Sequence, residues 1–283
     1  MKKVVLITGS STGFGALMAK TFDQSGFQVI ATMREPDGKN AAAAARLRAL
    51  PNTKVLEMDV TSEASIKAAV ANVLINYNRI DVLINNAGVY SGGVLEAFSI
   101  QQVQKVFDTN VYGVLRVNQE VLPVMRAAGE GLIITISSSV GRLSLPLQAP
   151  YNASKFAIEA LVEASHRELI PYGIETVLIE PGAFVTEIWA KAGINADRPA
   201  IIADYGQPLA DLQQHLTAAY GKVLQGKSAD PQLVADAALS LVMMDKGRRP
   251  LRTSVDPNAN GADIAYNEAT IKAAAHWLAQ YGI

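Results

Sequence analysis

The sequence predicts an α/β fold in which helices cover both faces of one parallel sheet, the doubly wound arrangement. Short apolar runs recur along the chain and longer helical patterns separate them, which is typical of βαβ units. A glycine-rich loop follows the first run directly, and right-handed crossovers favour the doubly wound arrangement. The chain has 283 residues, enough for one large domain, and shows no internal linker or repeat. We therefore expect a single domain over residues 1–283.

The apolar runs are the expected strands of this sheet. They lie at residues 4–7, 28–32, 55–58, 82–84, 132–136 and 176–179. Between them the alanine-rich stretch 41–50 predicts a helix rather than low-complexity sequence. The pattern weakens after Pro181, where residues 183–206 show little periodicity. Helices are expected again at 209–224, 231–244 and 262–280.

The loop after the first strand predicts a dinucleotide site. Gly9, Gly13 and Gly15 stand at its turns, with Ser11 and Thr12 between them, and an apolar helix begins inside it. Glycines allow the backbone to approach a pyrophosphate, and the N-terminus of a helix favours an anion. The spacing is G-x-x-x-G-x-G, not the more common G-x-G-x-x-G.

Tyr151 and Lys155 are the candidate chemical pair, because a spacing of four residues places both on one helical face. A free phenol has a pKa of about 10, and a neighbouring ammonium is expected to lower it. Ser138, upstream, can hold a carbonyl oxygen for the tyrosine to protonate. The alternative interpretation is a surface tyrosine and a solvated lysine, since this spacing is common in proteins.

Taken together, these motifs resemble the classical short-chain dehydrogenase/reductase family. The resemblance covers about residues 1–190 and rests on Thr8, Gly9, Gly13, Gly15, Asp59, Val60, Asn85, Asn86, Ala87, Gly88, Asn110, Ser138, Tyr151, Lys155, Pro181 and Gly182. Beyond these residues the chain is similar only in general architecture. Phe14 departs from the aliphatic residue that many members carry. The resemblance implies a Rossmann-type sheet and an oxidoreductase that uses a nicotinamide cofactor.

The resemblance also implies a role for each matched residue. The expected catalytic residues are Asn110, Ser138, Tyr151 and Lys155. In reduction, Ser138 and Tyr151 would bind the substrate carbonyl and Tyr151 would donate the proton. Lys155 would stabilise the phenolate and hold the cofactor ribose, while Asn110 would hold a water that links Lys155 to solvent. The expected cofactor contacts are Gly9, Ser11, Thr12, Gly13, Phe14, Gly15, Arg34, Asp59, Val60, Asn86, Ala87, Gly88, Tyr151, Lys155, Pro181, Gly182 and Thr186.

The end of the second strand favours NADP(H) over NAD(H), which stays possible. Many NAD enzymes carry an acid there to bind the ribose hydroxyl, and this chain carries Met33 instead. Arg34 can pair with a 2′-phosphate, and Thr12 can donate a further hydrogen bond. Glu35 and Asp37 favour the alternative of a solvated arginine, because acids pointing inward would oppose a phosphate.

We expect residues 183–228 to form a substrate lid and 247–283 a C-terminal extension. Phe184, Ile188 and Trp189 are the expected substrate contacts, together with Ser138 and Tyr151. A closing loop with an apolar inner face would exclude water from the reaction. A hydrophobic ketone is therefore the expected substrate. The alternative is that these apolar residues form a small satellite core.

Composition excludes several other classes of function. The net charge of −1, without a run of basic residues, argues against a nucleic-acid partner. The absence of cysteine excludes disulfides and thiol catalysis, and three histidines without ligand spacing argue against a metal site. No apolar stretch approaches the roughly 20 residues that span a bilayer, so we expect no membrane partner and a cytoplasmic protein.

The leading functional prediction is an NADP-dependent carbonyl reductase or alcohol dehydrogenase. The alternatives are an NAD-dependent alcohol or hydroxysteroid dehydrogenase, an epimerase or dehydratase, and a non-catalytic nucleotide-sensing protein. The last would be expected to lack Tyr151, Lys155 or Ser138, and all three are present. A homodimer through helices around 101–126 and 150–171 is expected. A tetramer is possible, although the tail lacks the Asp-Gly-Gly segment of many tetrameric members.

Overall fold

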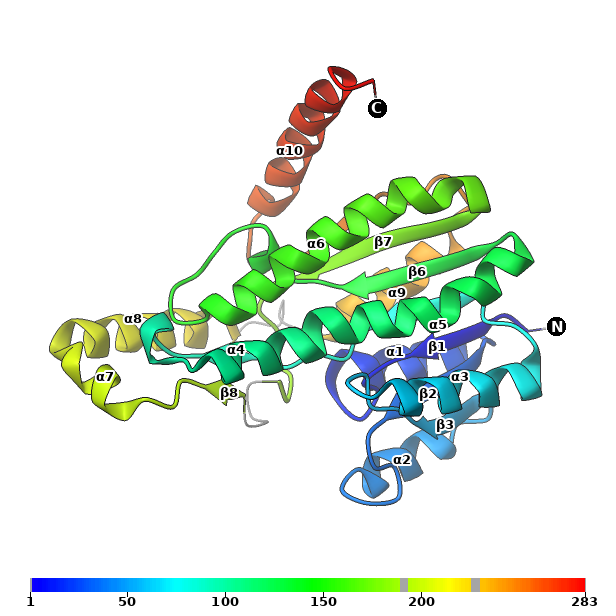
Figure 1. Ribbon diagram of the computed structural model, residues 1–283, viewed down its shortest axis with the longest axis horizontal. Coiled ribbons are helices and arrows are strands. Elements are labelled where there is room, and N and C mark those ends of the chain that lie inside the picture. The colour runs from blue at the N-terminus through cyan, green and yellow to red at the C-terminus, as the bar shows by residue number, and fades with distance from the viewer. Residues whose placement is uncertain (1, 189–192, 225–229, 283) are drawn as a thin grey trace.

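The structure, a computed structural model, describes residues 2–188, 193–224 and 230–282. At its centre lies a seven-stranded sheet whose neighbouring strands are all parallel, in the order β3-β2-β1-β4-β6-β7-β9 (Figure 1). The strands are β1 (Val4–Ile7), β2 (Gln28–Met33), β3 (Thr53–Glu57), β4 (Val82–Asn85), β6 (Gly131–Ile136), β7 (Ile174–Pro181) and β9 (Arg252–Val255). The predicted single-domain, doubly wound parallel sheet is confirmed, and each predicted strand is present with slightly different ends.

Alternation along the strands builds a separate core on each face of the sheet, because successive side chains point to opposite faces. Val5 and Ile7 pack toward one group of helices, whereas Leu6 packs toward the other. The first group is α1 (Gly13–Gln24), α2 (Ala41–Arg48) and α9 (Gln232–Met243). The second is α3 (Glu63–Tyr77), α5 (Gly113–Ala128) and α6 (Ala149–Leu169). Both faces are thus covered, and the carboxyl ends of the strands stay open.

The seventh strand, β9, is absent from the sequence-based prediction. It pairs in parallel with β7, from Arg252 opposite Leu178 to Val255 opposite Pro181. Its sequence is Arg-Thr-Ser-Val, so it lacks the apolar run that identified the other strands. The Arg252 side chain is nevertheless buried, because Glu159 and Glu163 of α6 pair with it. β9 is thus stabilised by buried ion pairs with a distant segment rather than by an apolar run that a sequence-based prediction could detect.

Two helices extend the molecule beyond the carboxyl ends of the strands. These are α7 (Pro199–Asp204) and α8 (Gly206–Leu224), which lie at the left of Figure 1. The predicted helix at 209–224 corresponds to α8. Residues 183–206, expected without regular structure, contain α7 and the short strand β8 (Ile194–Asn195). β8 pairs with β5 (Ser91–Gly92) and so fixes this segment beside the loop that follows β4.

The C-terminal helix α10 (Ala262–Ala279) projects away from the sheet (Figure 1). Asn267 is its one buried residue. Asn267 donates a hydrogen bond to Glu180 of β7 and accepts one from Arg142, while Thr270 accepts a second from Arg142. Polar contacts thus attach α10 to the carboxyl end of β7. Over the described part of the chain, no helix has the length and apolarity required to cross a bilayer.

Candidate active site

A cavity of about 880 Å³ opens at the carboxyl ends of the strands. Nearly all of the predicted site residues line it: Gly9, Ser11, Thr12, Gly13, Phe14, Arg34, Asp59, Val60, Asn86, Ala87, Gly88, Ser138, Tyr151, Lys155, Pro181, Gly182, Phe184, Thr186 and Ile188. Gly15 and Asn110 lie behind the wall, and the predicted substrate residue Trp189 lies outside the described residues. The fold therefore gathers residues from positions 9 to 188 around one space.

Close backbone contacts shape the glycine loop. Gly9 has a φ of +69°, and a Cβ at this position would lie 2.8 Å from Cα of Ala87. A Cβ on Gly15 would lie 2.5 Å from both the Asn86 side chain and the Gly9 carbonyl oxygen. The Asn86 amide donates hydrogen bonds to the carbonyl oxygens of Thr8 and Gly9 (2.8 and 3.1 Å). The loop after β1 and the segment after β4 are consequently locked together without room for side chains.

The N-terminus of α1 already binds an anionic group of the protein itself. The backbone N–H of Gly13, whose φ is +55°, donates a hydrogen bond to a carboxylate oxygen of Glu187 at 3.1 Å. A carboxylate here stands in for a phosphate, since both are oxyanions favoured by the helix dipole and free N–H groups. The loop therefore fits the pyrophosphate of a dinucleotide.

The two acidic residues of the loop after β2 form ion pairs with nearby cations. Glu35 pairs with Lys39 at 2.8 Å, and Asp37 pairs with Arg48 at 2.8 Å. Arg34 lines the cavity with Lys39 and forms no ion pair with any carboxylate of the described residues. Glu35 and Asp37, which the sequence offered as an argument against a phosphate at Arg34, are thus paired with other cations.

Asp59 closes the neighbouring wall of the cavity. Its carboxylate accepts hydrogen bonds from the backbone N–H and the hydroxyl of Thr61, at 2.9 and 2.8 Å. These contacts orient Asp59 just after β3, next to Val60, at a position expected to contact the cofactor.

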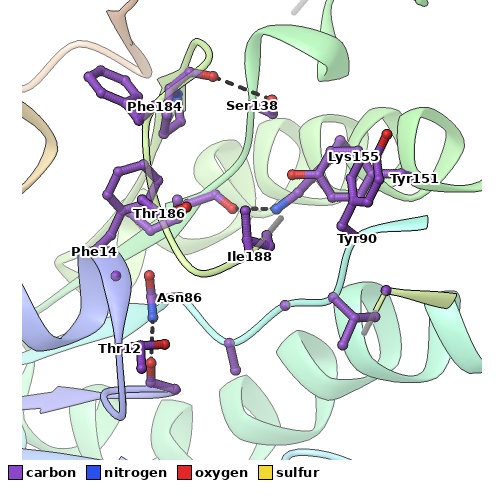
Figure 2. Close-up of a pocket in the computed structure, with 18 of the residues that line it drawn as sticks. Thr12, Phe14, Asn86, Tyr90, Ser138, Tyr151, Lys155, Phe184, Thr186 and Ile188 are labelled. Carbon is purple, nitrogen blue, oxygen red and sulfur yellow. Dashed lines mark hydrogen bonds between the residues drawn. The ribbon is translucent and has the colours of Figure 1, made fainter. Parts of the chain in front are cut away.

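Ser138 and Tyr151 meet on the opposite side of the cavity, and Figure 2 shows them with Lys155 and Tyr90 around the same space. The Ser138 hydroxyl donates a hydrogen bond to the Pro181 carbonyl oxygen at 3.3 Å. Burial raises the pKa of Tyr151 above its usual value, and a hydrogen bond with Ser138 opposes the rise. The phenol therefore stays protonated at neutral pH.

Lys155 lies beside Tyr151, as its helical spacing predicts, with Nζ 5.6 Å from the centre of the phenol ring. Nζ donates a hydrogen bond to the Ile136 carbonyl oxygen at 2.9 Å. Burial lowers the pKa of Lys155 to about 8, and the negative charge of Glu159 opposes this effect. Lys155 thus remains mostly an ammonium at neutral pH. The expected net lowering of the Tyr151 pKa is not found, because desolvation of the phenol outweighs the contributions that lower it.

Asn110 lies in a π-helical turn, η2 (Asp108–Tyr112), between α4 (Ile100–Phe107) and α5. A continuous helix was expected here. The Asn110 amide accepts a hydrogen bond from the Val89 N–H at 2.8 Å, and donates to the Val89 carbonyl and to the Ser154 hydroxyl at 2.9 and 3.0 Å. The side chain therefore connects the segment after β4 to α6, the helix that carries Tyr151 and Lys155. π-turns of this kind frequently occur at functional sites.

Phe184 contributes to the core as well as to the cavity. It is 2% exposed and packs edge-on against Phe14, with ring centres 5.6 Å apart. Part of the satellite-core alternative therefore holds for Phe184, whereas Ile188 is directed toward the cavity (Figure 2).

Several wall residues are missing from the sequence-based prediction. Tyr90, Gln148 and Tyr220 line the cavity near Tyr151, and Asp256 follows β9 beside Gly182. Tyr90 stands two residues after the matched Asn85–Gly88 segment, and that nearness was the one available signal. The others reach the site only through tertiary structure.

Comparisons with known proteins identify the family of the chain. The sequence model described as short chain dehydrogenase matches residues 3–197. An uncharacterized oxidoreductase, YusZ of Bacillus subtilis, is 38% identical over 249 residues, which cover 85% of this chain and 84% of that protein. A 3-ketodihydrosphingosine reductase of Bacteroides thetaiotaomicron is 39% identical over 184 residues, 65% of each chain. An NADPH-dependent 3-dehydrocapnine reductase of Ornithobacterium rhinotracheale is 33% identical and covers 75% of this chain and 76% of its own.

Solved structures show the same fold. A short-chain dehydrogenase from Streptomyces avermitilis superimposes with a TM-score of 0.76 at 30% identity, covering 100% of this chain and 97% of its own. Actinorhodin polyketide ketoreductase with NADPH gives a TM-score of 0.75 at 27% identity, covering 90% and 95%. A Burkholderia phymatum short chain dehydrogenase/reductase in complex with NAD gives 0.73 at 27% identity, covering 92% and 90%. The chain belongs to the short-chain dehydrogenase/reductase family of oxidoreductases.

Proposed function

We propose that this chain is an NADP(H)-dependent oxidoreductase that interconverts a hydrophobic ketone or aldehyde and the corresponding alcohol. The convergence of Ser138, Tyr151 and Lys155 at one wall of the cavity carries this proposal. A bound nicotinamide would supply or accept the hydride, and the protein would supply position and charge.

Tyr151 is the proton donor of the proposed reduction. Its buried phenol is protonated at neutral pH, and Ser138 can hydrogen-bond the same carbonyl oxygen that receives the proton. The ammonium of Lys155 lies close enough to stabilise the phenolate that proton transfer leaves behind. Asn110 acts in this scheme by fixing α6 through Ser154. In the oxidative direction the phenolate would take the proton back.

The cation pair Arg34 and Lys39 supports a preference for NADP(H). Both line the cavity at the end of β2, where Met33 replaces the acid expected of many NAD enzymes. Lys39 can exchange its exposed partner Glu35 for a phosphate, because exposed ion pairs contribute little free energy. One relative's name also specifies NADPH.

A hydrophobic substrate is supported by apolar side chains of the cavity wall. Leu145, Ile188 and Val223 line the cavity, and Val223 belongs to α8. Two relatives are named as reductases of 3-ketodihydrosphingosine and 3-dehydrocapnine. Each CH₂ buried in such a pocket contributes roughly 0.8 kcal/mol.

The test is a series of methyl alkyl ketones of rising chain length, assayed with NADPH and with NADH through the absorbance of the reduced cofactor. We expect kcat/KM to rise with chain length and NADPH to be the better cofactor. A preference for pyruvate or for sugars would contradict the apolar pocket, and turnover of none of the carbonyl compounds would contradict the proposed activity.

A further inference from the structure

The segment of residues 183–188, which follows β7, lies against the glycine loop at the N-terminus of α1. Phe184 packs edge-on against Phe14, with ring centres 5.6 Å apart. A Cβ on Gly13 would lie 3.6 Å from Cβ of Thr186. Figure 2 shows Phe184 and Thr186 of this segment together with Phe14 of the loop. Segment 183–188 and the glycine loop are therefore in contact at more than one point.

Glu187 supplies a polar part of this contact. Its carboxylate oxygen Oε2 accepts a hydrogen bond from the backbone N–H of Gly13 at 3.1 Å, and a Cβ on Gly13 would lie 3.8 Å from the same oxygen. The first N–H groups of a helix have no partner within the helix, and its dipole favours an anion there. The negative charge of Glu187 thus occupies a position that suits any oxyanion.

The cofactor requires the same position. In a dinucleotide-binding fold the pyrophosphate lies at the N-terminus of the helix that follows the glycine loop, and Gly13 lines the cavity there. A carboxylate and a pyrophosphate held side by side at one helix terminus repel each other, since both are negatively charged. Only one of the two is therefore expected to bind the Gly13 N–H at a time.

The two ends of segment 183–188 differ in how firmly they are held. Phe184 is 2% exposed and belongs to the core, whereas Val185 is 58% exposed and Glu187 is exposed as well. Glu187 can consequently leave the loop without a loss of buried apolar contacts. The Phe184 side chain stays in the core when it does so.

We propose that Glu187 competes with the cofactor for the N-terminus of α1. In the cofactor-free protein its carboxylate binds the Gly13 N–H and holds segment 183–188 against the loop. When the dinucleotide binds, the pyrophosphate displaces the carboxylate, and the Glu187 side chain turns to solvent. The contact therefore weakens cofactor binding. This inference rests on the proposed function in one respect, that the glycine loop binds a dinucleotide.

The test measures ligand binding to the full-length protein by titration calorimetry. ADP-ribose and 2′-phospho-ADP-ribose contain the pyrophosphate, and adenosine 2′-monophosphate lacks it. Glu187→Gln removes the charge and keeps the shape of the side chain, whereas Glu187→Ala removes the acceptor. We expect both variants to bind the pyrophosphate ligands roughly two- to tenfold more tightly than the wild type, the factor that corresponds to one net hydrogen bond. Affinity for adenosine 2′-monophosphate should not change.

Asp197→Asn is the matched control, because it changes the net charge by the same amount. Asp197 is exposed, follows β8 and does not line the cavity, so its replacement should leave all three affinities unchanged. Thermal unfolding of each variant shows whether the fold persists.

The outcomes separate this inference from the proposed function. If neither Glu187 variant binds the pyrophosphate ligands more tightly, Glu187 does not compete with the cofactor and the inference is wrong while the proposed function stands. An equal gain for adenosine 2′-monophosphate, or for Asp197→Asn, would show a general effect of charge and would also overturn the inference. If the wild type binds none of the three ligands, the proposed nucleotide site fails and the inference fails with it.

Discussion

Helices α1 and α8 border the same cavity, but the protein holds them in different ways. α1 has 12 residues, and its buried residues Met18, Ala19 and Phe22 belong to the core formed with the sheet and α9. α8 has 19 residues, and Leu209 is the one buried among them. The nucleotide side of the cavity is therefore part of the main core, whereas the substrate side is attached by few contacts.

This difference indicates that one side of the cavity binds the cofactor rigidly and that the other side adapts to the substrate. A loop locked by close backbone contacts presents an invariant shape, which suits a cofactor that is the same in every turnover. Segments with few buried apolar contacts belong to the less stable end of a structure, and lids are commonly drawn from it. We therefore expect changes on the nucleotide side to act on binding and chemistry, and changes on the substrate side to act on specificity and local opening.

Tyr151→Phe is expected to have the largest effect on turnover, because Tyr151 lies between the nucleotide side and the substrate side of the cavity. The change removes one hydroxyl, and general acid–base terms contribute roughly 10²–10⁴-fold to rates. Turnover of an apolar ketone should fall by that factor, while NADPH affinity, measured by fluorescence, stays close to that of the wild type. Tyr172→Phe, at an exposed position, is the control. Retention of more than about a tenth of the activity would assign the acid to another group.

Arg34→Ala tests whether the preformed side recognises the 2′-phosphate. A hydrogen bond to a charged group contributes roughly 1.5–3 kcal/mol, so NADPH affinity should fall by that amount and NADH affinity should change little. Met33→Asp combined with Arg34→Ala should move the preference toward NADH, because an acid repels the phosphate and accepts from the ribose hydroxyl.

Titration calorimetry with both cofactors measures the effect of Arg34, and Arg46→Ala on the exposed side of α2 is the matched control. Equal losses for the two cofactors would place Arg34 outside the phosphate pocket.

Glu180 links the attachment of α10 to pH. Burial raises its pKa to about 7, and the charge of Glu159 adds to the rise, while Asn267, Arg142 and Arg252 oppose it. The folded state thus holds a proton that the unfolded chain has released, so this contribution to stability is lost as pH rises from about 4.5 to about 7.

Glu180→Gln removes that titration. Between about pH 5 and pH 8 the free energy of unfolding of the variant should rise relative to the wild type by at least roughly 1.4 kcal/mol, the value of one pKa unit. Urea unfolding at several pH values measures it, with exposed Glu168→Gln as control. A constant difference between variant and wild type would refute the assigned proton.

Tyr205→Phe should have the smallest effect of this series. Its hydroxyl donates to Glu96 at 2.8 Å and joins the region of α7 and α8 to the body of the molecule. We expect faster proteolysis near these helices without a change in global unfolding, since their opening is local. Tyr281→Phe, exposed on the tail, is the control. A lowered global unfolding temperature would show that the substrate side belongs to the main core after all.

The same contrast explains what could be predicted from the sequence. Apolar runs such as Val4–Ile7 carry their own signal, because a strand buried on both faces must be apolar along its length. β9 carries none, since Arg252 becomes buried only through Glu159 and Glu163, far away in the chain. A local pattern does not contain such pairs.

The residues of the candidate site also differ in whether a local sequence pattern could identify them. The glycine loop and the Tyr151–Lys155 pair are local motifs, and the structure brings them to one cavity. Gln148 and Tyr220 come together only after α8 folds over the strand ends, so no spacing could indicate them. Phe184 was visible as an apolar residue, but its contact with Phe14 depends on the packing of two distant segments.

The proposed reaction is the reduction of an apolar ketone in this cavity with hydride from NADPH. The most direct measurement uses NADPH that carries deuterium at the transferable position of the nicotinamide, with methyl nonyl ketone as substrate. We expect the wild type to form an alcohol with deuterium on the carbinol carbon, and Tyr151→Phe to form it roughly 10²–10⁴-fold more slowly. Failure of the wild type to form the deuterated alcohol, or equal formation by the variant, would contradict this expectation.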